Sequence, residues 1–260
     1  MRIDAPFPNA EYNFVAPGIR ADGTPCVLKV RRTTDQSHAE IAALRVWDGQ
    51  AAVRLLEADA ERGGMLLERI EPGSMLDQVV ADDDRATRIA ADLLRQLWHP
   101  APDAPHDLIP LERWCAAYER TRSPLVSGVD TFPKKLFERA DRLRADLLAS
   151  TTEPVMLHGD LHHFNILRST ARADWLAIDP HGLVGDRYFD ICQFLRNPEL
   201  MPIAVNRRRV DIFCSELGLD RQRAKNWCVV HAVLDACWSF EEQDPGLPER
   251  IAYAKAMLDL

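Results

Sequence analysis

The sequence lacks long hydrophobic runs and closely spaced cysteine pairs. No stretch reaches the roughly 18 uninterrupted apolar residues of a membrane-spanning helix, so we expect no membrane span. The first residues lack the apolar core of a secretory signal peptide. The six cysteines are scattered without a C-x-x-C pair, which favours buried, reduced thiols over a disulfide framework. We therefore expect a cytoplasmic protein.

Basic charge is also scarce. Lys and Arg total 32 against 40 Asp and Glu, which gives a formal net charge of −8. Binding to nucleic acid needs a basic surface that faces the phosphates, so we expect no nucleic-acid partner. An acidic chain is better suited to a cationic small molecule.

What the chain does contain is an ordinary globular composition, with 47% hydrophobic and 28% charged residues in 260 positions. This length allows one large domain or two lobes with a cleft between them. Residues 1–70 are predicted to form a small β-rich unit, and the Pro72-Gly73 pair marks its boundary. The expected elements of this unit are strands at 24–30, 52–56 and 65–70 and a helix at 37–47.

Residues 71–260 are predicted to be mainly helical. Residues 153–185 differ, because short apolar runs alternate there with polar residues, as is typical of a hairpin. The sequence therefore predicts an α+β protein with two lobes, residues 1–70 and 71–260. The expected helices of the second lobe are 82–98, 113–120, 134–148, 187–195, 207–217, 221–240 and 248–258.

The segment from His158 to Asp179 carries the most chemical information. Asp160 and Asn165 are five positions apart on a loop that leaves an apolar strand, and Asp179 ends the return strand of the hairpin. Because a hairpin brings its two ends together, we expect these three side chains to converge. Phosphoryl transfer needs one carboxylate to orient the attacking hydroxyl group. It also needs a second carboxylate and an amide oxygen to hold the magnesium ions that bridge the phosphates.

Residues upstream could complete a nucleotide site. Lys29 lies inside an apolar strand, and its amine could reach the phosphates of ATP, although a snorkelling surface lysine is the alternative. Glu40, in the next helix, could pair with Lys29. Glu68 and Ile70 end the last strand before the boundary, where their backbone groups could hydrogen-bond an adenine edge. ATP and Mg²⁺ are therefore the expected cofactors.

These motifs resemble the aminoglycoside phosphotransferases of the protein-kinase-like fold, and more narrowly the streptomycin 6-kinase (aminoglycoside/hydroxyurea resistance kinase) branch. The resemblance covers roughly residues 10–200. In the second lobe it is carried by HGDLHH at 158–163, NIL at 165–167, IDP at 178–180, GLVGD at 182–186, FD at 189–190 and NP at 197–198. In the first lobe it is carried by ADGTP at 21–25, VLK at 27–29, AALR at 42–45, WDG at 47–49 and LLERI at 66–70.

The resemblance implies a bilobal protein-kinase-like fold and ATP-dependent phosphorylation of a hydroxyl group on an aminoglycoside, most narrowly streptomycin. It implies that Asp160 is the catalytic base and that Asn165 and Asp179 hold Mg²⁺. It also implies that Lys29 contacts the phosphates and that Glu40 positions Lys29.

Other residues have supporting roles under the same resemblance. Asp190 is expected to brace the catalytic loop, and His158 is expected to pack that loop rather than to react. Three acidic residues near the end of the chain, Glu241, Glu242 and Asp244, are candidates for holding the ammonium or guanidinium groups of an aminoglycoside. A solvated helix end is the alternative for these three.

One feature departs from the kinase pattern. Kinases cover the phosphates with a loop between the first two strands that is often rich in glycine, but only Gly18 and Gly23 precede Lys29 here. Residues 7–13 are the candidate covering loop, so the first strand must be very short or absent. Two alternatives stay open, because fold alone does not settle function. One is a metabolite kinase without a resistance role, and the other is a pseudokinase that binds nucleotide and acts as an interaction module.

Overall fold

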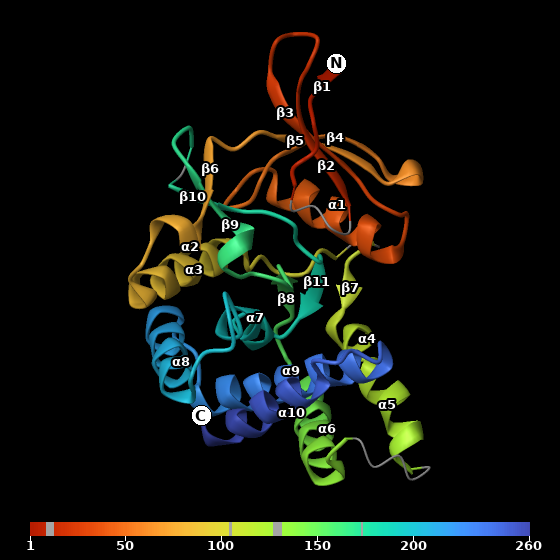
Figure 1. The fold of residues 1–260 in the computed structure, drawn as a ribbon, viewed down its shortest axis with the longest axis vertical. Helices are drawn as coiled ribbons and strands as arrows, with labels where there is room; N and C mark the ends of the chain where they lie inside the picture. The colour runs from red at the N-terminus through yellow and green to blue at the C-terminus, as the bar shows by residue number, and fades with distance from the viewer. Residues whose placement is uncertain (9–12, 104–105, 127–131, 173) are drawn as a thin grey trace.

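The computed structural model describes residues 1–8, 13–103, 106–126, 132–172 and 174–260. A β-rich lobe lies at the top of Figure 1 and a mainly helical lobe lies below it. The α+β class predicted from the sequence is therefore confirmed. The proposed boundary between residues 70 and 71 falls in the segment that joins β5 to β6. Among the described helices, none is long and apolar enough to cross a membrane.

Five antiparallel strands form the N-terminal sheet, in the order β1-β2-β3-β5-β4. Lys29 is paired with Val15 on one side and with Met65 on the other, so it lies in the middle of the sheet. The strand β1 has only two residues, so the prediction of a very short first strand is confirmed. The strands are β1 (Arg2–Ile3), β2 (Phe14–Ile19), β3 (Pro25–Val30), β4 (Leu55–Asp59) and β5 (Gly64–Glu68).

Helix α1 (Asp35–Trp47) follows β3 and packs against the sheet. It begins where the side chain of Thr34 accepts a hydrogen bond from the backbone N–H of Ser37, which is a capping box. Its apolar face buries Ile41, Leu44 and Trp47. This orientation also buries Glu40 completely, so a charged residue enters the interior at this position.

The predicted strand at 52–56 is displaced in the structure. β4 begins at Leu55, and the preceding residues pair instead with the second lobe through an isolated bridge between Ala52 and Ala177. The N–H of Val53 donates to the carbonyl of Ala177 at 2.8 Å, and the N–H of Ala177 donates to the carbonyl of Ala51 at 2.9 Å. These bonds fix the hairpin of the second lobe beside the N-terminal lobe.

The C-terminal lobe combines helices with two three-stranded sheets, of order β10-β9-β6 and β7-β11-β8. In Figure 1, α9 and α10 run side by side across the lower half of the molecule, with α6 below them. Its strands are β6 (Pro72–Met75), β7 (Ile109–Pro110), β8 (Val155–Leu157), β9 (Ile166–Ser169), β10 (Trp175–Ala177) and β11 (Leu183–Gly185). Its α-helices are α2 (Leu76–Val79), α3 (Asp83–Leu97), α4 (Leu111–Trp114), α5 (Ala117–Val126), α6 (Lys134–Ala149), α7 (Cys192–Leu195), α8 (Ile203–Leu217), α9 (Arg221–Glu241) and α10 (Leu247–Ala256). The short 3₁₀ turns are η1 (Ala60–Arg62), η2 (His163–Asn165), η3 (Arg187–Phe189) and η4 (Met257–Asp259).

Two segments that were each predicted to form one continuous helix are broken into two shorter elements in the structure. The segment 113–120 is divided between α4 and α5, and the segment 187–195 is divided between η3 and α7. The second break falls at Asp190, whose carboxylate turns inward and accepts backbone hydrogen bonds from the 158–159 loop. A long-range contact of this kind overrides the local helical pattern, which is all that sequence periodicity reports.

Candidate active site

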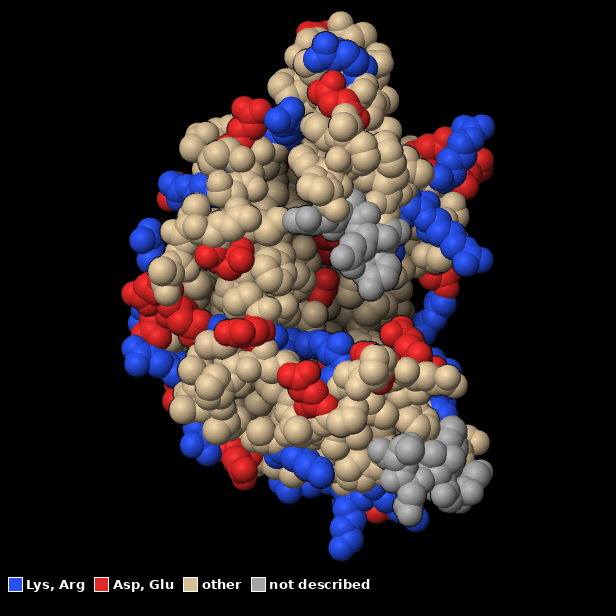
Figure 2. Space-filling model, in the orientation of Figure 1, with Lys and Arg blue, Asp and Glu red and all other residues tan. Residues whose placement is uncertain are grey.

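The hairpin of β9 and β10 brings distant parts of the sequence together. Ile166 pairs with Ala177, and the N–H of Ile178 donates to the carbonyl of Asn165 at 2.9 Å. Asn165 therefore lies next to the segment that carries Asp179. Figure 2 shows that the molecule is hollowed between the two lobes and that acidic side chains are visible inside the hollow.

Asp160 and Asn165 contact each other directly. The Nδ2 group of Asn165 donates to the carbonyl oxygen of Asp160 at 2.9 Å and to its Oδ2 atom at 3.2 Å. With the amide nitrogen used in this way, the Oδ1 atom of Asn165 has no hydrogen-bond partner among the described residues. This oxygen is also absent from the set of buried side-chain atoms that lack a partner. It is therefore exposed and open to a ligand from solvent.

Asp179 lies opposite the N-terminal lobe and is bound by Lys29. The Nζ atom of Lys29 donates to Oδ1 of Asp179 and, at 2.6 Å, to Oε1 of Glu40. Lys29 is only 4% exposed, which excludes a snorkelling surface lysine. Burial by itself lowers the pKa of Lys29, but the charges of Glu40 and Asp179 outweigh it and raise that pKa.

The backbone of Asp179 is in an unusual conformation. Its φ angle is +58°, in the left-handed region that aspartate tolerates better than most residues other than glycine. Outliers of this type concentrate at functional sites, where the surrounding structure holds them in place. The conformation directs one carboxylate oxygen at Lys29, while the other has no hydrogen-bond partner among the described side chains.

Sequence reasoning missed Arg31. Its Nη1 atom donates to Oε2 of Glu40 at 2.8 Å, so Glu40 uses both carboxylate oxygens to bind two cations. A signal was present in the sequence, because extended backbone that continues past the end of a strand still projects residues two apart to the same face, and Arg31 directly follows β3. Arg31 follows Lys29 by two positions.

Asp190 lies beneath the loop that carries Asp160. Its Oδ1 atom accepts the N–H of Gly159 at 2.7 Å, and its Oδ2 atom accepts the N–H of His158 at 2.9 Å and the indole Nε1–H of Trp98 at 3.1 Å. Burial raises the pKa of Asp190 to about 6, although these three hydrogen bonds lower it. The geometry suits the bracing role that the resemblance implies.

His158 is fully buried and hydrogen-bonded on both sides of its ring. Its Nδ1 atom accepts the N–H of Asp160 at 3.2 Å, and its Nε2 atom lies 2.9 Å from the carbonyl oxygen of Ile178, which requires that Nε2 carries the proton. Burial lowers the pKa of His158 to about 4, so the ring is neutral at pH 7. Both nitrogens are committed, which suits a packing residue rather than a reactant.

Two other histidines surround the carboxylate of Asp160, and sequence reasoning did not place them there. The Nε2 atoms of His162 and His181 lie 3.5 Å and 3.8 Å from Oδ2 of Asp160. Burial raises the pKa of Asp160, but the hydrogen bond with His162 and attraction to the histidines outweigh it and lower the pKa to about 2. Asp160 is therefore a carboxylate across the neutral pH range.

Glu68 and Ile70, the two residues predicted to hydrogen-bond the adenine edge, differ in whether their backbone N–H groups are free to do so. The N–H of Glu68 donates to the carbonyl of Arg54 at 2.9 Å, and its side chain accepts from the Arg54 N–H and from Arg172. The N–H of Glu68 is therefore committed within the protein. The N–H of Ile70, by contrast, has no hydrogen-bond partner among the residues that the structure describes.

The acidic residues proposed for substrate binding are not equivalent. Glu241 forms a two-pronged ion pair with Arg120, at 2.8 Å and 3.0 Å. Asp244 accepts the N–H of Gly246 at 2.8 Å, and its other contacts are also internal. Glu242 is exposed and has no ion-pair partner within the described part of the chain. Only Glu242 is therefore free to bind a ligand cation.

The candidate covering loop at 7–13 lies partly outside the described residues, since 9–12 are not described. On its described side, the N–H of Phe7 donates to the carbonyl of Val15 at 2.8 Å. Phe14, at the start of β2, pairs with Val30. These contacts place Phe7 and Phe14 at the end of the sheet where β3 leads to α1.

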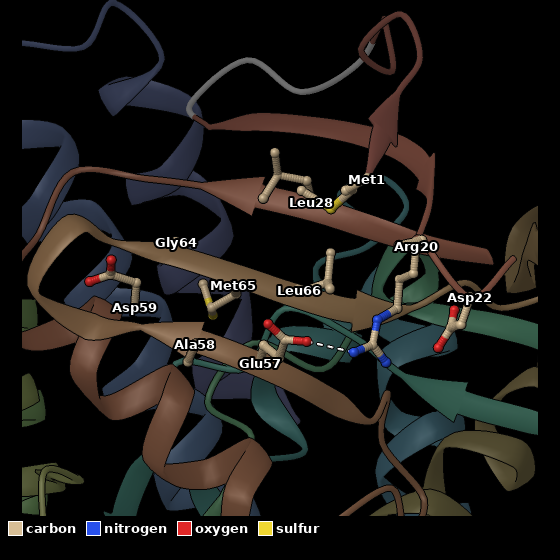
Figure 3. Close-up of a pocket in the computed structure, with 11 residues that line it drawn as sticks. Met1, Arg20, Asp22, Leu28, Glu57, Ala58, Asp59, Gly64, Met65 and Leu66 are labelled. Atoms are coloured by element: carbon tan, nitrogen blue, oxygen red, sulfur yellow. Dashed lines mark hydrogen bonds and ion pairs between the residues drawn. The ribbon is translucent and has the colours of Figure 1, made fainter. Parts of the chain in front are cut away.

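An open groove elsewhere contains none of the predicted site residues. It has a volume of about 550 Å³ and lies on the N-terminal sheet, where Leu28, Leu66 and Glu57 border it (Figure 3). An ion pair of 2.6 Å between Arg20 and Glu57 crosses it. The lining residues are Met1, Arg20, Ala21, Asp22, Leu28, Glu57, Ala58, Asp59, Gly64, Met65 and Leu66.

Comparison with known proteins identifies the family. A model of the aminoglycoside/hydroxyurea antibiotic resistance kinases matches residues 8–243. The chain is 35% identical to a hydroxyurea phosphotransferase of Kitasatospora aureofaciens, covering 99% of this chain and 75% of that protein. It is 34% identical to a streptomycin 6-kinase of Streptomyces glaucescens, covering 99% and 85% respectively.

The fold is shared with solved kinase structures. The amicoumacin kinase hAmiN, solved in complex with AMP-PNP, Ca²⁺ and Ami, superposes with a TM-score of 0.67 at 15% identity, covering 99% of this chain and 88% of that one. A likeness at this identity concerns the fold alone. The family match spans both lobes and includes every residue of the loop and hairpin described above. This chain is accordingly a phosphotransferase that belongs to the aminoglycoside/hydroxyurea antibiotic resistance kinase family.

Proposed function

We propose that this protein transfers the γ-phosphoryl group of ATP to a hydroxyl group of an aminoglycoside, with streptomycin as the first candidate acceptor. One observation carries the proposal. Asp160, Asn165 and Asp179 gather at one end of the β9–β10 hairpin, and Asp179 faces the buried Lys29–Glu40 pair across the lobe junction. This is the arrangement of polar groups that phosphoryl transfer from a nucleotide requires.

Asp160 is proposed as the catalytic base. Its low pKa makes it a weak base, so its main contribution is to orient the acceptor hydroxyl group and to receive the proton late in the reaction. This matches a loose transition state, in which positioning and charge neutralisation supply most of the rate acceleration. Asp190 supports the loop from below by holding the backbone N–H groups of His158 and Gly159.

The oxygen atoms of Asn165 and Asp179 fit Mg²⁺. Both are hard donors, and each side chain keeps one oxygen without a hydrogen-bond partner among the described residues. Mg²⁺ held by these two side chains would supply charge neutralisation for the phosphates. Lys29 would then exchange its contact with Asp179 for one with a phosphate oxygen, while Glu40 keeps hold of its ammonium group.

The names of the relatives support the choice of acceptor. They include streptomycin kinases and a hydroxyurea phosphotransferase, so hydroxyurea is the second candidate. The net charge of −8 favours the cationic streptomycin and argues against a nucleic-acid partner. The presence of every polar residue of the transfer site argues against a pseudokinase. All six cysteines are free, and we propose a reducing, cytoplasmic location for them.

The decisive experiment measures ADP release from ATP and Mg²⁺ with a panel of acceptors. The panel contains streptomycin, other aminoglycosides, hydroxyurea, and metabolites such as choline and homoserine. We expect release that depends on streptomycin and that Asp160→Asn abolishes. Release with a metabolite alone would show a metabolite kinase, and no release with any acceptor would show a pseudokinase.

A further inference from the structure

A row of aromatic rings leads away from the catalytic carboxylate. The Nε2 atom of His181 lies 3.8 Å from Oδ2 of Asp160. The ring of His181 packs against Trp114 with a centroid distance of 4.7 Å. Trp114 in turn meets Trp238 edge to face, at 5.8 Å between centroids. Trp114 ends α4 and Trp238 lies in the last turn of α9, so the row joins two elements that are distant in sequence.

The segment that presents His181 is tightly fixed. Gly182 has a φ angle of +65°, and a Cβ atom there would lie only 2.2 Å from the carbonyl oxygen of Ala39 in α1. The N–H of His181 also donates to the carbonyl of His158 at 2.7 Å. The aromatic row therefore begins at a rigid point beside the catalytic loop, where the two lobes meet.

The two indoles are half-buried and keep their N–H groups available. Neither Trp114 nor Trp238 donates a hydrogen bond within the described residues. Neither indole nitrogen is a buried unsatisfied atom, so both are open to solvent. Three other tryptophans do donate to protein oxygens, namely Trp47 to Leu97, Trp98 to Asp190 and Trp227 to Asp186. Trp114 and Trp238 therefore differ from the tryptophans that serve the core.

A carboxylate without a partner among the described residues follows Trp238 at the end of α9. Glu242 follows Trp238 by four positions at the end of α9, so the two residues share one side of the helix. Glu241 pairs with Arg120 and Asp244 binds Gly246 and Arg250, but Glu242 is exposed and unpaired among the described residues. An aromatic face together with a free carboxylate is a suitable environment for a planar guanidinium group.

We propose that Trp114, Trp238 and Glu242 form the acceptor subsite, and that it holds a guanidinium or ammonium group of the substrate while a hydroxyl group of the same molecule reaches Asp160. The inference rests on the proposed function for the identity of the reaction, but the binding it describes is measurable without turnover. The indole faces supply cation–π contacts, and their N–H groups can donate to substrate oxygens.

The test measures streptomycin binding by calorimetry in the presence of a non-hydrolysable ATP analogue and Mg²⁺. Trp238→Leu is expected to weaken binding by ~5- to 30-fold, as expected for the loss of a desolvated cation–π contact. Trp238→Phe should keep most of the affinity, because an aromatic face remains. The KM for ATP should stay within about twofold of wild type in both variants, since Lys29 and Ile70 are untouched.

Trp175→Leu is the matched control. Trp175 is also a partly buried tryptophan, but it lies on β10 and stacks with Arg168 at 5.4 Å, away from the row. We expect it to leave streptomycin affinity unchanged. Equal effects of Trp175→Leu and Trp238→Leu would overturn the proposal, as would a wild-type protein that binds no streptomycin. An equal loss of affinity for neutral hydroxyurea would also refute a cation subsite.

These outcomes separate the subsite from the proposed function. In one outcome the wild type binds streptomycin, the Trp238→Leu variant does not, and the wild type releases no ADP with any aminoglycoside. The subsite is then supported and the proposed reaction is wrong. If streptomycin is phosphorylated but Trp238→Leu and Glu242→Gln both bind it normally, the reaction stands and the subsite is wrong.

Discussion

Arg31 provides a sharp test of how the nucleotide site is built. In the structure, Glu40 is fully buried and divides its two carboxylate oxygens between Lys29, at 2.6 Å, and Arg31, at 2.8 Å. In the proposed function, Lys29 exchanges its contact with Asp179 for one with a phosphate oxygen. We infer that Arg31 keeps Glu40 in one orientation while Lys29 changes partner. Replacing Arg31 with alanine removes that second anchor.

The expected effect on stability follows from burial. The side chain of Glu40 is 1% exposed and that of Arg31 is 13% exposed, so the pair is largely shielded from water. A hydrogen bond to a charged group contributes about 1.5–3 kcal/mol, and breaking a fully buried pair costs about 3–5 kcal/mol. Because Lys29 still neutralises Glu40, we expect the free energy of unfolding to fall by about 2 kcal/mol. For a chain of this size that lowers Tm by roughly 4–8 °C.

The assay compares Arg31→Ala, Arg31→Lys and Arg32→Ala by urea unfolding and by ATP-dependent kinetics. Arg32 is the matched control, because it is the adjacent arginine and is exposed. We expect Arg31→Ala to raise the KM for ATP about tenfold, which corresponds to about 1.4 kcal/mol, and Arg31→Lys to recover part of this loss. If Arg31→Ala matches Arg32→Ala in both stability and KM for ATP, then Glu40 needs no second anchor and the reasoning is refuted.

Four further predictions concern the carboxylates of the site. Asp160→Asn should reduce kcat by about 10²- to 10⁴-fold in steady-state assays and leave ATP affinity by calorimetry nearly unchanged, and near-normal turnover would remove Asp160 from the mechanism. Since its pKa is lowered to about 2, Asp160 is ionised at every pH above that value, so the acid limb of the kcat/KM profile between pH 5 and 8 should not belong to it. Asp179→Ala should abolish the dependence of nucleotide affinity on Mg²⁺, and an unchanged magnesium titration would count against its role as a ligand. The pKa of Asp190 is raised from 3.8 to about 6, so the native state binds this proton more tightly than the unfolded chain does, and the free energy of unfolding should fall by about 3 kcal/mol as pH rises through this window. Asp190→Asn should remove that slope in urea unfolding measured at pH 4 and pH 7, and an identical slope in both proteins would show that the buried carboxylate is not its source.

The sequence by itself predicted the elements that carry the proposed transfer-site residues, and the structure confirms those elements. Apolar runs broken by polar residues predicted the hairpin, and β9 and β10 form it. The strand around Lys29 and the helix around Glu40 were also readable, because side-chain periodicity and capping are local signals. A hairpin also fixes which residues meet at its ends, so the proximity of Asn165 to the Asp179 segment followed from the pattern.

Only the tertiary structure decided how charges and rings are shared between distant segments. It placed a second cation on Glu40 and joined Trp114 to His181 and Trp238. Among the described residues it left Glu242 without an ion-pair partner while Glu241 pairs with Arg120. It also broke the expected helix at Asp190, whose carboxylate is drawn to a loop more than thirty positions earlier in the chain. Periodicity describes what each segment prefers alone, whereas these contacts depend on where segments that are far apart in sequence finally pack.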